Sequence, residues 1–312
     1  MMRWRWMAMT ASLALAACHQ PEQQAAPSAA HAPAAATSTA KVVSHFEPPP
    51  ESSIPHDDFG KQIALGRQIF TDTGRYAKAY VGNALNCENC HLDAGRLAHS
   101  APMWGAYPMY PAYRAKNHHV NTFAERLQGC FQYSMNGKAP PLGDDVLVAL
   151  EAYAYWMSKG EPIGVAPPGH GYPKLPKPAQ TPDYARGEAV FRRDCALCHG
   201  DNGQGQRVAD RTAFPPLWGA QSFNWGAGME RLDNASGFIK ANMPLGRGNT
   251  LTDQDAWDVA YFMNAHERPQ DPRFKGSIIE TRKAYHDTPD SLYGAEVSGR
   301  ILGEGVANPR SP

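Results

Sequence analysis

The sequence predicts a mostly α-helical protein built from two tandem domains. Two Cys-x-x-Cys-His motifs, Cys87–His91 and Cys195–His199, each follow a run of residues with helical apolar spacing. Similar runs recur before and after both motifs, so the sequence contains two copies of one domain. A stretch rich in proline and glycine, residues 164–182, separates the copies and is predicted to be a linker.

The internal repeat defines the expected helices. Residues 65–70 and 186–191 share the pattern Gly-x-x-Ile/Val-Phe ahead of the two cysteine motifs. Further on, residues 141–143 and 244–246 both read Pro-Leu-Gly, and Ala154–Met157 matches Ala260–Met263 in a closing helix that Thr252 is expected to cap in the second copy. The predicted domains span residues 54–163 and 183–268.

The N-terminal residues predict export. Arg3 and Arg5 precede an apolar run, residues 7–17, that is too short to span a bilayer and is typical of a signal peptide, 1–17. The run ends in Leu-Ala-Ala-Cys, which resembles a bacterial lipobox and predicts acylation of Cys18. We therefore expect a periplasmic protein held at a membrane by a lipid anchor alone.

Two further segments and the overall charge complete the expected organisation. Residues 18–53 are rich in Ala, Pro, Gln, Ser and Thr and are predicted to form a flexible tether. A polar C-terminal tail, residues 269–312, contains Tyr285 and Tyr293 and is expected to pack over one or both domains. Thirty basic residues balance thirty acidic ones among 312, so the composition gives no reason to expect a nucleic-acid partner.

The Cys-x-x-Cys-His spacing indicates covalent haem attachment. Two thiols about one helical turn apart can add to the two vinyl groups of one haem, and the adjacent histidine reaches the iron. A zinc or thiol-redox site is the alternative, but the histidine follows immediately in both copies. The sequence thus predicts two cytochrome c domains of the class I type, each with a haem c bound through Cys87 and Cys90 or Cys195 and Cys198, with His91 and His199 as proximal ligands.

The distal ligand of the second haem is expected from the loop after His199. Met229 and Met243 are the candidates, and a thioether would raise the reduction potential as electron transfer requires. Met243 precedes Pro244 shortly before the closing helix, which favours it. Met263 lies inside the helical pattern and is interpreted as core packing.

For the first haem, the loop between residues 92 and 143 offers several donors: Met103, Met109, His118, His119, Cys130 and Met135. The histidine pair is interpreted as a solvated loop, and Met103 and Met109, among Trp104, Tyr107 and Tyr110, as packing against the haem edge. Cys130 is the one cysteine left unassigned. A buried inert thiol is one reading of Cys130, and an iron-bound thiolate that escapes oxidation is the other.

Residues 126–137, downstream of Cys87–His91, closely resemble the diheme thiosulfate dehydrogenases that form tetrathionate. The resemblance extends over roughly residues 59–293. It implies His91 and Cys130 as axial ligands of the catalytic haem, and a second haem that passes electrons to an external cytochrome c or similar acceptor. Some members have a lysine directly before the second-haem methionine, whereas this chain has Asn242 there and Lys240 further back.

The expected chemistry agrees with this resemblance. Joining two thiosulfate dianions into tetrathionate releases two electrons, and two haems can take one each. Arginine suits such oxyanions, and on a continuous helix Arg126, Cys130 and Ser134 would share one face. The resemblance points to Arg126 and Ser134 as catalytic residues and adds Arg114, for which a solvated basic loop with Lys116 is the alternative.

Two other functions compete with thiosulfate oxidation. One is a sulfur-oxidising cytochrome subunit that transfers sulfur to a carrier protein, and the other is a diheme cytochrome that only transfers electrons. Cys130 argues against the second, because methionine or histidine would serve a simple carrier. The stretch around Cys130 disfavours the first. The sequence does not fix the direction of the reaction, so tetrathionate reduction stays open.

Overall fold

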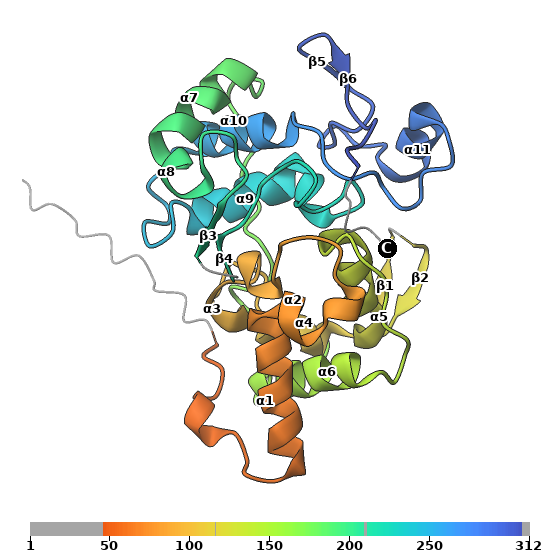
Figure 1. Ribbon diagram of the computed structural model, residues 1–312. Helices are drawn as coiled ribbons and strands as arrows, with labels where there is room; N and C mark the ends of the chain where they lie inside the picture. The colour runs from red at the N-terminus through yellow and green to blue at the C-terminus, as the bar shows by residue number, and fades with distance from the viewer. Residues whose placement is uncertain (1–45, 116, 209–210, 308–312) are drawn as a thin grey trace, which may run out of the picture. The chain divides into compact units, whose positions relative to one another are not determined.

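In the computed structural model, which describes residues 46–115, 117–208 and 211–307, helices form most of the regular structure (Figure 1). The first half contains α1 (Asp58–Thr71), α2 (Thr73–Tyr76), α3 (Leu92–Gly95), α4 (Met103–Ala106), α5 (Phe123–Gly129), the π-helix η5 (Cys130–Ser134) and α6 (Asp145–Met157). The second half contains α7 (Tyr184–Asp194), α8 (Ala196–His199), α9 (Leu232–Asn242) and α10 (Asp253–Asn264), and α11 (Ile278–Tyr285) follows.

Short elements connect these helices. Three antiparallel pairs are β1 (Ala112–Arg114) with β2 (His119–Asn121), β3 (Gln206–Val208) with β4 (Arg211–Phe214), and β5 (Glu296–Val297) with β6 (Arg300–Ile301). Single 3-10 turns are η1 (Glu51–Ser53), η2 (Lys78–Tyr80), η3 (Cys87–Asn89), η4 (Tyr107–Met109) and η6 (Gly228–Glu230). No described helix has the length and apolar character needed to cross a membrane.

The repeated glycine marks a close crossing of two helices in each half. A Cβ atom added at Gly66 of α1 would lie 2.1 Å from the backbone oxygen of Ala149 in α6. At Gly187 of α7 the corresponding distance to the oxygen of Asp258 in α10 is also 2.1 Å. Only glycine permits so close an approach of two backbones. The predicted duplication is thus visible as the same crossing formed twice.

Side chains at the helix termini explain where the crossing helices begin. Asp57 and Asp183 accept hydrogen bonds from backbone amides in the first turns of α1 and α7. Asp144 caps α6 in the same way, and Thr252 Oγ1 accepts from Asp255 N at 3.0 Å to cap α10, as the sequence predicts.

The segment predicted to be a flexible tether is partly docked. The ring of Phe46 packs on Trp104 with centroids 5.6 Å apart. Arg96 Nη2 donates to the backbone oxygens of Pro48 and Pro49 at 3.0 and 2.9 Å. The expectation of a tether is therefore wrong for residues 46–51, because a partly buried aromatic ring, two carbonyl acceptors and the 2.7 Å ion pair of Glu51 with Arg67 fix them to the first half. Residues 1–45, with the predicted signal peptide and Cys18, lie outside the described residues.

Residues 164–182, the segment predicted to be a linker, contain neither helix nor strand and are fixed to both halves. Gly169 O accepts from His99 N at 2.7 Å, and Gly171 O accepts from Ala101 N at 2.9 Å. On the other side, Trp257 Nε1 of α10 donates to Pro176 O at 3.0 Å. The linker therefore joins the two halves through hydrogen bonds as well as through the chain.

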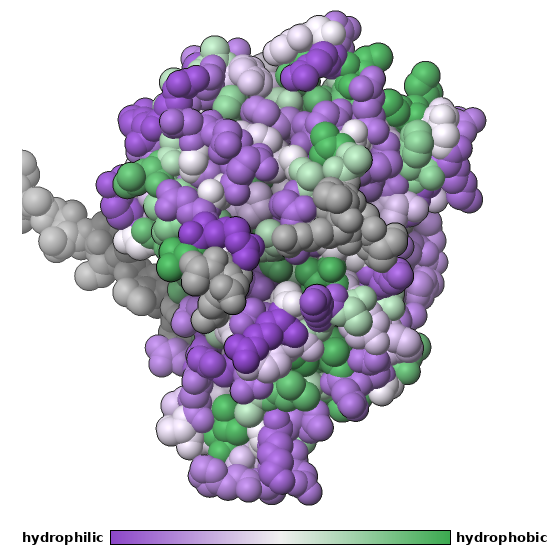
Figure 2. Space-filling view, in the orientation of Figure 1, coloured by the Kyte–Doolittle hydropathy of each residue, from purple (hydrophilic) through white to green (hydrophobic). Residues whose placement is uncertain are grey.

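The C-terminal segment packs on the second half. Tyr293 is fully buried, and its ring lies 5.6 Å from that of Trp225. Leu292, Val297 and Leu302 join the same apolar cluster. Tyr285, the other tyrosine noted in the sequence, is 41% exposed at the end of α11. On the face shown in Figure 2, hydrophilic residues predominate and hydrophobic residues are scattered between them.

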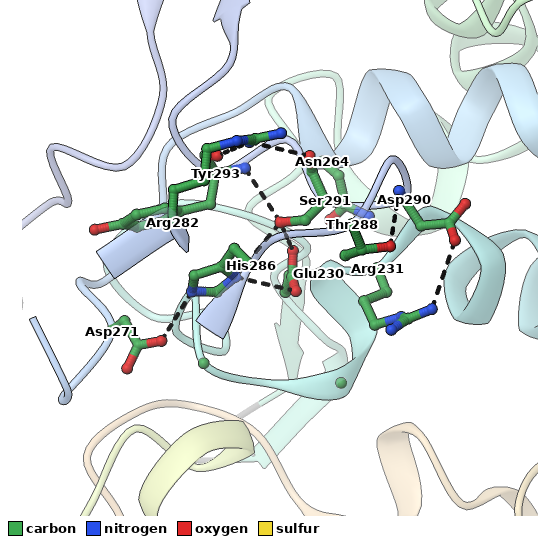
Figure 3. A network of polar contacts seen from close by, with 12 residues as sticks. Glu230, Arg231, Asn264, Asp271, Arg282, His286, Thr288, Asp290, Ser291 and Tyr293 are labelled. Carbon is green, nitrogen blue, oxygen red and sulfur yellow. Dashed lines mark hydrogen bonds and ion pairs between the residues drawn. The ribbon is translucent and has the colours of Figure 1, made fainter. Parts of the chain in front are cut away.

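A buried ionic network fastens this segment (Figure 3). His286, 1% exposed, lies between two carboxylates: Nε2 is 2.9 Å from Asp271 Oδ2 and Nδ1 is 3.3 Å from Glu230 Oε1. Ser291 Oγ donates to Glu230 at 2.7 Å, and Arg273 forms a bidentate pair with Asp271. Burial opposes charging of His286, but the hydrogen bonds to Asp271 and Glu230 outweigh it and raise its pKa above 6.5.

This network predicts a pH-dependent stability. Because the folded pKa of His286 is raised, its stabilising contribution is fully present below about pH 6.5 and is lost as the pH rises through the folded value. Relative to the wild type, His286→Gln should therefore lose more stability at about pH 6 than at about pH 9. Thermal unfolding of the full chain across this range measures the difference.

His56→Gln is the matched control, since His56 is exposed just ahead of α1. Its stability curve should run parallel to that of the wild type. A His286→Gln curve that is also parallel to the wild type would contradict the role of the network.

Candidate active site and haem-binding residues

The first Cys-x-x-Cys-His motif begins in the turn η3. Burial raises the pKa of Cys87 and Cys90 to about 12, so both are neutral thiols when free. His91 Nδ1 donates to Ala101 O at 2.7 Å, which leaves Nε2 available to a metal. Burial also lowers the pKa of His91 to about 4, and the neutral imidazole is the state that ligates iron.

The second motif repeats this arrangement at the end of α7. Cys195 follows the last residue of that helix, and α8 carries Cys198 and His199. His199 Nδ1 donates to Pro215 O at 2.9 Å, and burial lowers the pKa of His199 below its usual value. In both halves a backbone carbonyl therefore fixes the ring and its tautomer, and the other nitrogen is free to ligate.

A cavity of about 390 Å³ adjoins the second motif. Both candidate methionines, Met229 and Met243, line it together with Cys195, Cys198 and His199. The remaining walls are mostly apolar, and they include residues from the first half: Leu85, Cys90, Leu92 and Leu97. Two thiols, an imidazole, a thioether and apolar walls fit a covalently bound haem. The structure thus keeps both methionines as candidates and places the cavity at the contact between the halves.

Cys130 stands at a change of helix type. The helix α5 ends at Gly129, and the chain continues as the π-helix η5. One turn earlier, Arg126 Nη1 donates to Cys130 Sγ at 3.1 Å. The electrostatic interaction with Cys130 is the main cause that raises the pKa of Arg126. The predicted pair of Arg126 and Cys130 is therefore brought together.

Ser134 is the last residue of the π-helix that Cys130 begins. The expectation of one continuous α-helix is wrong, because the chain changes from α-helix to π-helix at Cys130. Among the described contacts, Ser134 acts through its backbone oxygen, which accepts from Asn83 Nδ2 at 2.8 Å.

Tyr110 connects the two predicted arginines. Arg114 Nη1, at the end of β1, donates to Tyr110 Oη at 3.0 Å, and Arg126 also hydrogen-bonds Tyr110. Burial raises the pKa of Tyr110 despite these cations, so its phenol stays neutral. The sequence predicts no role of its own for Tyr110, and nothing in the local pattern shows that its hydroxyl lies between two guanidinium groups. Lys116, the alternative partner of Arg114, lies outside the described residues.

Four of the other donors considered for the first haem lie either in the apolar core or on the surface. Met103 and Met135 are buried in the first core, 7% and 3% exposed. His118 and His119 lie exposed at the β1–β2 hairpin, as expected of a solvated pair. Of this set, Cys130 is the donor whose sulfur atom accepts a hydrogen bond from an arginine, Arg126.

Tyr172 of the linker also reaches this region and was not predicted. Its ring lies 6.5 Å from the His91 ring and 5.5 Å from the Phe238 ring. Phe238 lines the cavity beside the second Cys-x-x-Cys-His motif. Its hydroxyl donates to Cys90 O at 3.3 Å. The one sequence feature that could have pointed to Tyr172 is the presence of an aromatic residue in an otherwise Pro/Gly-rich stretch.

Comparisons with known proteins follow this division into halves. Residues 74–163 match the family described as SoxA/TsdA, cytochrome c domain, and residues 182–263 match the family of cytochrome c oxidase, cbb3-type, subunit III. Thiosulfate dehydrogenase of Thiomonas intermedia (strain K12) is 61% identical over 266 residues, which cover 85% of each chain. Thiosulfate dehydrogenase of Stutzerimonas stutzeri (strain A1501) is 55% identical and covers 84% of this chain and 86% of that protein.

A solved structure shares the fold. Thiosulfate dehydrogenase (TsdBA) from Marichromatium purpuratum superposes with a TM-score of 0.82 at 48% identity. The match covers 85% of this chain and 59% of the other, so this chain spans less than two thirds of that solved protein. Two cytochrome c domains, each with a Cys-x-x-Cys-His motif, imply two covalently bound haem c groups. With these relatives and this fold, the chain belongs to the thiosulfate dehydrogenase family.

Proposed function

We propose that this chain oxidises two thiosulfate dianions to one tetrathionate and passes the two electrons to an external cytochrome c or similar acceptor. The observation that carries the proposal is the 3.1 Å contact from Arg126 to Cys130 beside the first haem motif, in a chain 61% identical to a thiosulfate dehydrogenase. The reaction forms one sulfur–sulfur bond between the substrates, and each substrate gives up one electron. The same site would run tetrathionate reduction if the acceptor supplied electrons.

The donor sets support one role for each haem. The catalytic haem would be held by Cys87, Cys90, His91 and Cys130, and the electron-transfer haem by Cys195, Cys198, His199 and Met243. When bound, each haem supplies a one-electron acceptor. A thiolate ligand lowers the reduction potential and a methionine raises it, so electrons would pass from the first site to the second.

Cations near Cys130 would bind the substrate anions. Arg126 and Arg114 flank the neutral phenol of Tyr110, and together they offer several N–H donors and one hydroxyl. Guanidinium groups match the oxygens of a thiosulfate better than an ammonium does. Arg126, whose Nη1 lies 3.1 Å from Cys130 Sγ, would attract the dianion whose sulfur approaches this cysteine. Ser134, which the resemblance implied as a further catalytic residue, has its described contact through the backbone.

The alternative functions are not favoured. A cytochrome that only transfers electrons has no use for a partly buried arginine directed at a cysteine sulfur. A sulfur-transferring subunit would need a carrier protein, whereas the proposed enzyme turns over with thiosulfate and an electron acceptor alone. An assay without any carrier protein separates these activities.

Electron exit is proposed at the second haem motif. Leu197, between the two attachment cysteines of that motif, is 89% exposed, and Leu245 on the rim of the cavity is 60% exposed. Exposed apolar side chains at a cofactor edge suit a transient redox contact, which is small and brief. These two leucines therefore mark the surface where an acceptor would approach.

The chain is further proposed to be exported to the periplasm and anchored through an acylated Cys18. The basic residues and apolar run at the N-terminus support export, and the Leu-Ala-Ala-Cys ending supports acylation. Cytochrome c domains of this kind agree with an exported protein.

Substitution of Cys130 tests the reaction centre. Cys130→Gly should nearly abolish thiosulfate oxidation while both haems stay attached, because attachment depends on the four motif cysteines. Its low-spin thiolate signal in electron paramagnetic resonance should disappear. Arg126→Ala should instead raise KM by roughly 10- to 100-fold and preserve most of the haem spectrum, since hydrogen bonds between charged groups are worth about 1.5–3 kcal/mol each. A Cys130→Gly protein with full activity and an unchanged signal would refute the assignment.

Substitution of Met243 tests the second haem. Met243→Gly should remove the near-infrared methionine-to-iron band and lower the potential of that haem, because a thioether ligand is lost. Met229→Leu is the matched control, since Met229 lines the same cavity. The band should persist in this control. The reverse pattern would make Met229 the ligand.

The anchor is tested by Cys18→Ser. The variant should move from the membrane fraction to the soluble periplasmic fraction, since no described helix could hold the chain in a bilayer. Mass spectrometry of the mature N-terminus should show an acylated cysteine in the wild type. An unmodified N-terminus at another residue would rule the anchor out.

A further inference from the structure

The π-helix that carries Cys130 is held by groups from outside the helix. Three successive backbone oxygens in or next to its last turn accept hydrogen bonds from other segments. Gln132 O accepts from Asn224 Nδ2 at 2.9 Å, Tyr133 O accepts from Asn224 N at 3.2 Å, and Ser134 O accepts from Asn83 Nδ2 at 2.8 Å. The last carbonyls of a helix have no partner within it, so these outside donors satisfy them and stabilise the end of the π-helix.

Asn224 belongs to the second half and uses its whole amide in this contact. The residue is 1% exposed. Besides Gln132 O, its Nδ2 donates to Asn136 Oδ1 at 3.0 Å, and its Oδ1 accepts from Gly226 N at 3.0 Å. A buried amide with all these bonds made has a single favourable orientation. The geometry at Cys130 is thus coupled to one side chain of the second half.

The neighbouring backbone is shaped to the π-helix as well. A Cβ atom at Gly226 would lie 2.4 Å from Cδ1 of Tyr133, so only glycine lets the second half approach this closely. The guanidinium of Arg273, from the C-terminal segment, lies 5.1 Å from the centre of the Tyr133 ring. The second half and the C-terminal segment therefore contact the Tyr133 side chain of the π-helix, in addition to the hydrogen bonds to its carbonyls.

The loop that carries Asn224 is itself fixed. Arg268 is fully buried, and its guanidinium lies 4.2 Å from the ring of Phe223 and 5.1 Å from that of Trp225. Arg268 Nη2 also donates to Asn264 Oδ1 at 3.0 Å, and Trp225 N donates to Pro269 O at 3.0 Å. Since both neighbours of Asn224 are held, a change at Asn224 is expected to act on the π-helix more than on its own loop.

We infer that Asn224 is a positioning residue for Cys130: the second domain, besides carrying electrons away, sets the geometry of the π-turn that presents the cysteine sulfur to the first haem. The inference rests on the proposed role of Cys130 as a haem ligand. It assigns to the second half a part in building the catalytic site, through hydrogen bonds to Gln132, Tyr133 and Asn136.

Asn224→Asp in the full-length holoprotein is the test. The variant keeps the size of the side chain and the acceptor for Gly226 N, but it replaces the Nδ2 donor with a carboxylate oxygen facing Gln132 O and Asn136 Oδ1. We expect the thiolate-ligated low-spin signal of the first haem to shift or lose intensity. We also expect kcat to fall about 10- to 100-fold with little change in KM, as when a reacting group is misplaced by on the order of 1 Å.

Asn242→Asp is the matched control. Asn242 is 5% exposed, and its Nδ2 donates across the halves to His99 O at 3.1 Å and to Phe238 O at 3.0 Å. The chemical change and the kind of contact are the same, but His99 and Phe238, the described acceptors of Asn242, do not belong to the π-helix. This variant should lose thermal stability to a similar extent and leave the thiolate signal of the first haem unchanged.

Two outcomes would overturn the inference: a folded Asn224→Asp protein with an unchanged thiolate signal and kcat, or equal disturbance of that signal by both variants. If Asn224→Asp does not accumulate, Asn224→Ala keeps the backbone bond to Tyr133 and should shift the signal less in the same direction, and an unchanged signal would again refute the role. A wild-type protein that does not oxidise thiosulfate, while Asn224→Asp still shifts the signal, would reject the proposed function and support the positioning role.

Discussion

The close crossing of the first and last long helices in each half is the constraint on which the structure depends. At Gly66 and Gly187 the backbones approach so closely that any side chain would collide with a carbonyl oxygen of the partner helix. The phenylalanine four positions further along each helix is then buried beneath the crossing. In the second half, the haem motif follows directly at the end of the crossing helix, so the position of Cys195 is fixed by this packing.

Much of this arrangement could be predicted, because it depends on short sequence patterns. The two Cys-x-x-Cys-His motifs state the cofactor chemistry directly, and the repeated Gly-x-x-Ile/Val-Phe pattern reveals the duplication before any contact is known. The caps of the helices and the contact between Arg126 and Cys130 follow from short-range spacing, in which residues four apart on a helix are neighbours. Thus the fold class, the two haem motifs and the first cation at the cysteine were all accessible from the chain alone.

The features that the sequence did not predict depend on hydrogen bonds between residues far apart in the chain. Residues 123–134 read as one helix, but the turn at Cys130 widens into a π-helix whose carbonyls are satisfied by Asn83 and Asn224. Tyr110 looks like an ordinary aromatic residue until its hydroxyl is seen to hydrogen-bond Arg126, further along the chain in α5. Such long-range hydrogen bonds leave no periodic trace in composition or spacing, because only the folded chain brings the two groups together.

The duplicated halves are no longer interchangeable units. Phe223 and Ala227 of the second half are buried in the core of the first, and Leu92 of the first packs against the core of the second. Splitting the chain within the linker would leave each fragment with a gap in its own interior and with buried polar groups deprived of partners, at a cost of about 1–3 kcal/mol for each such group. We therefore expect separated halves to fold by complementation, each serving as the template for the other.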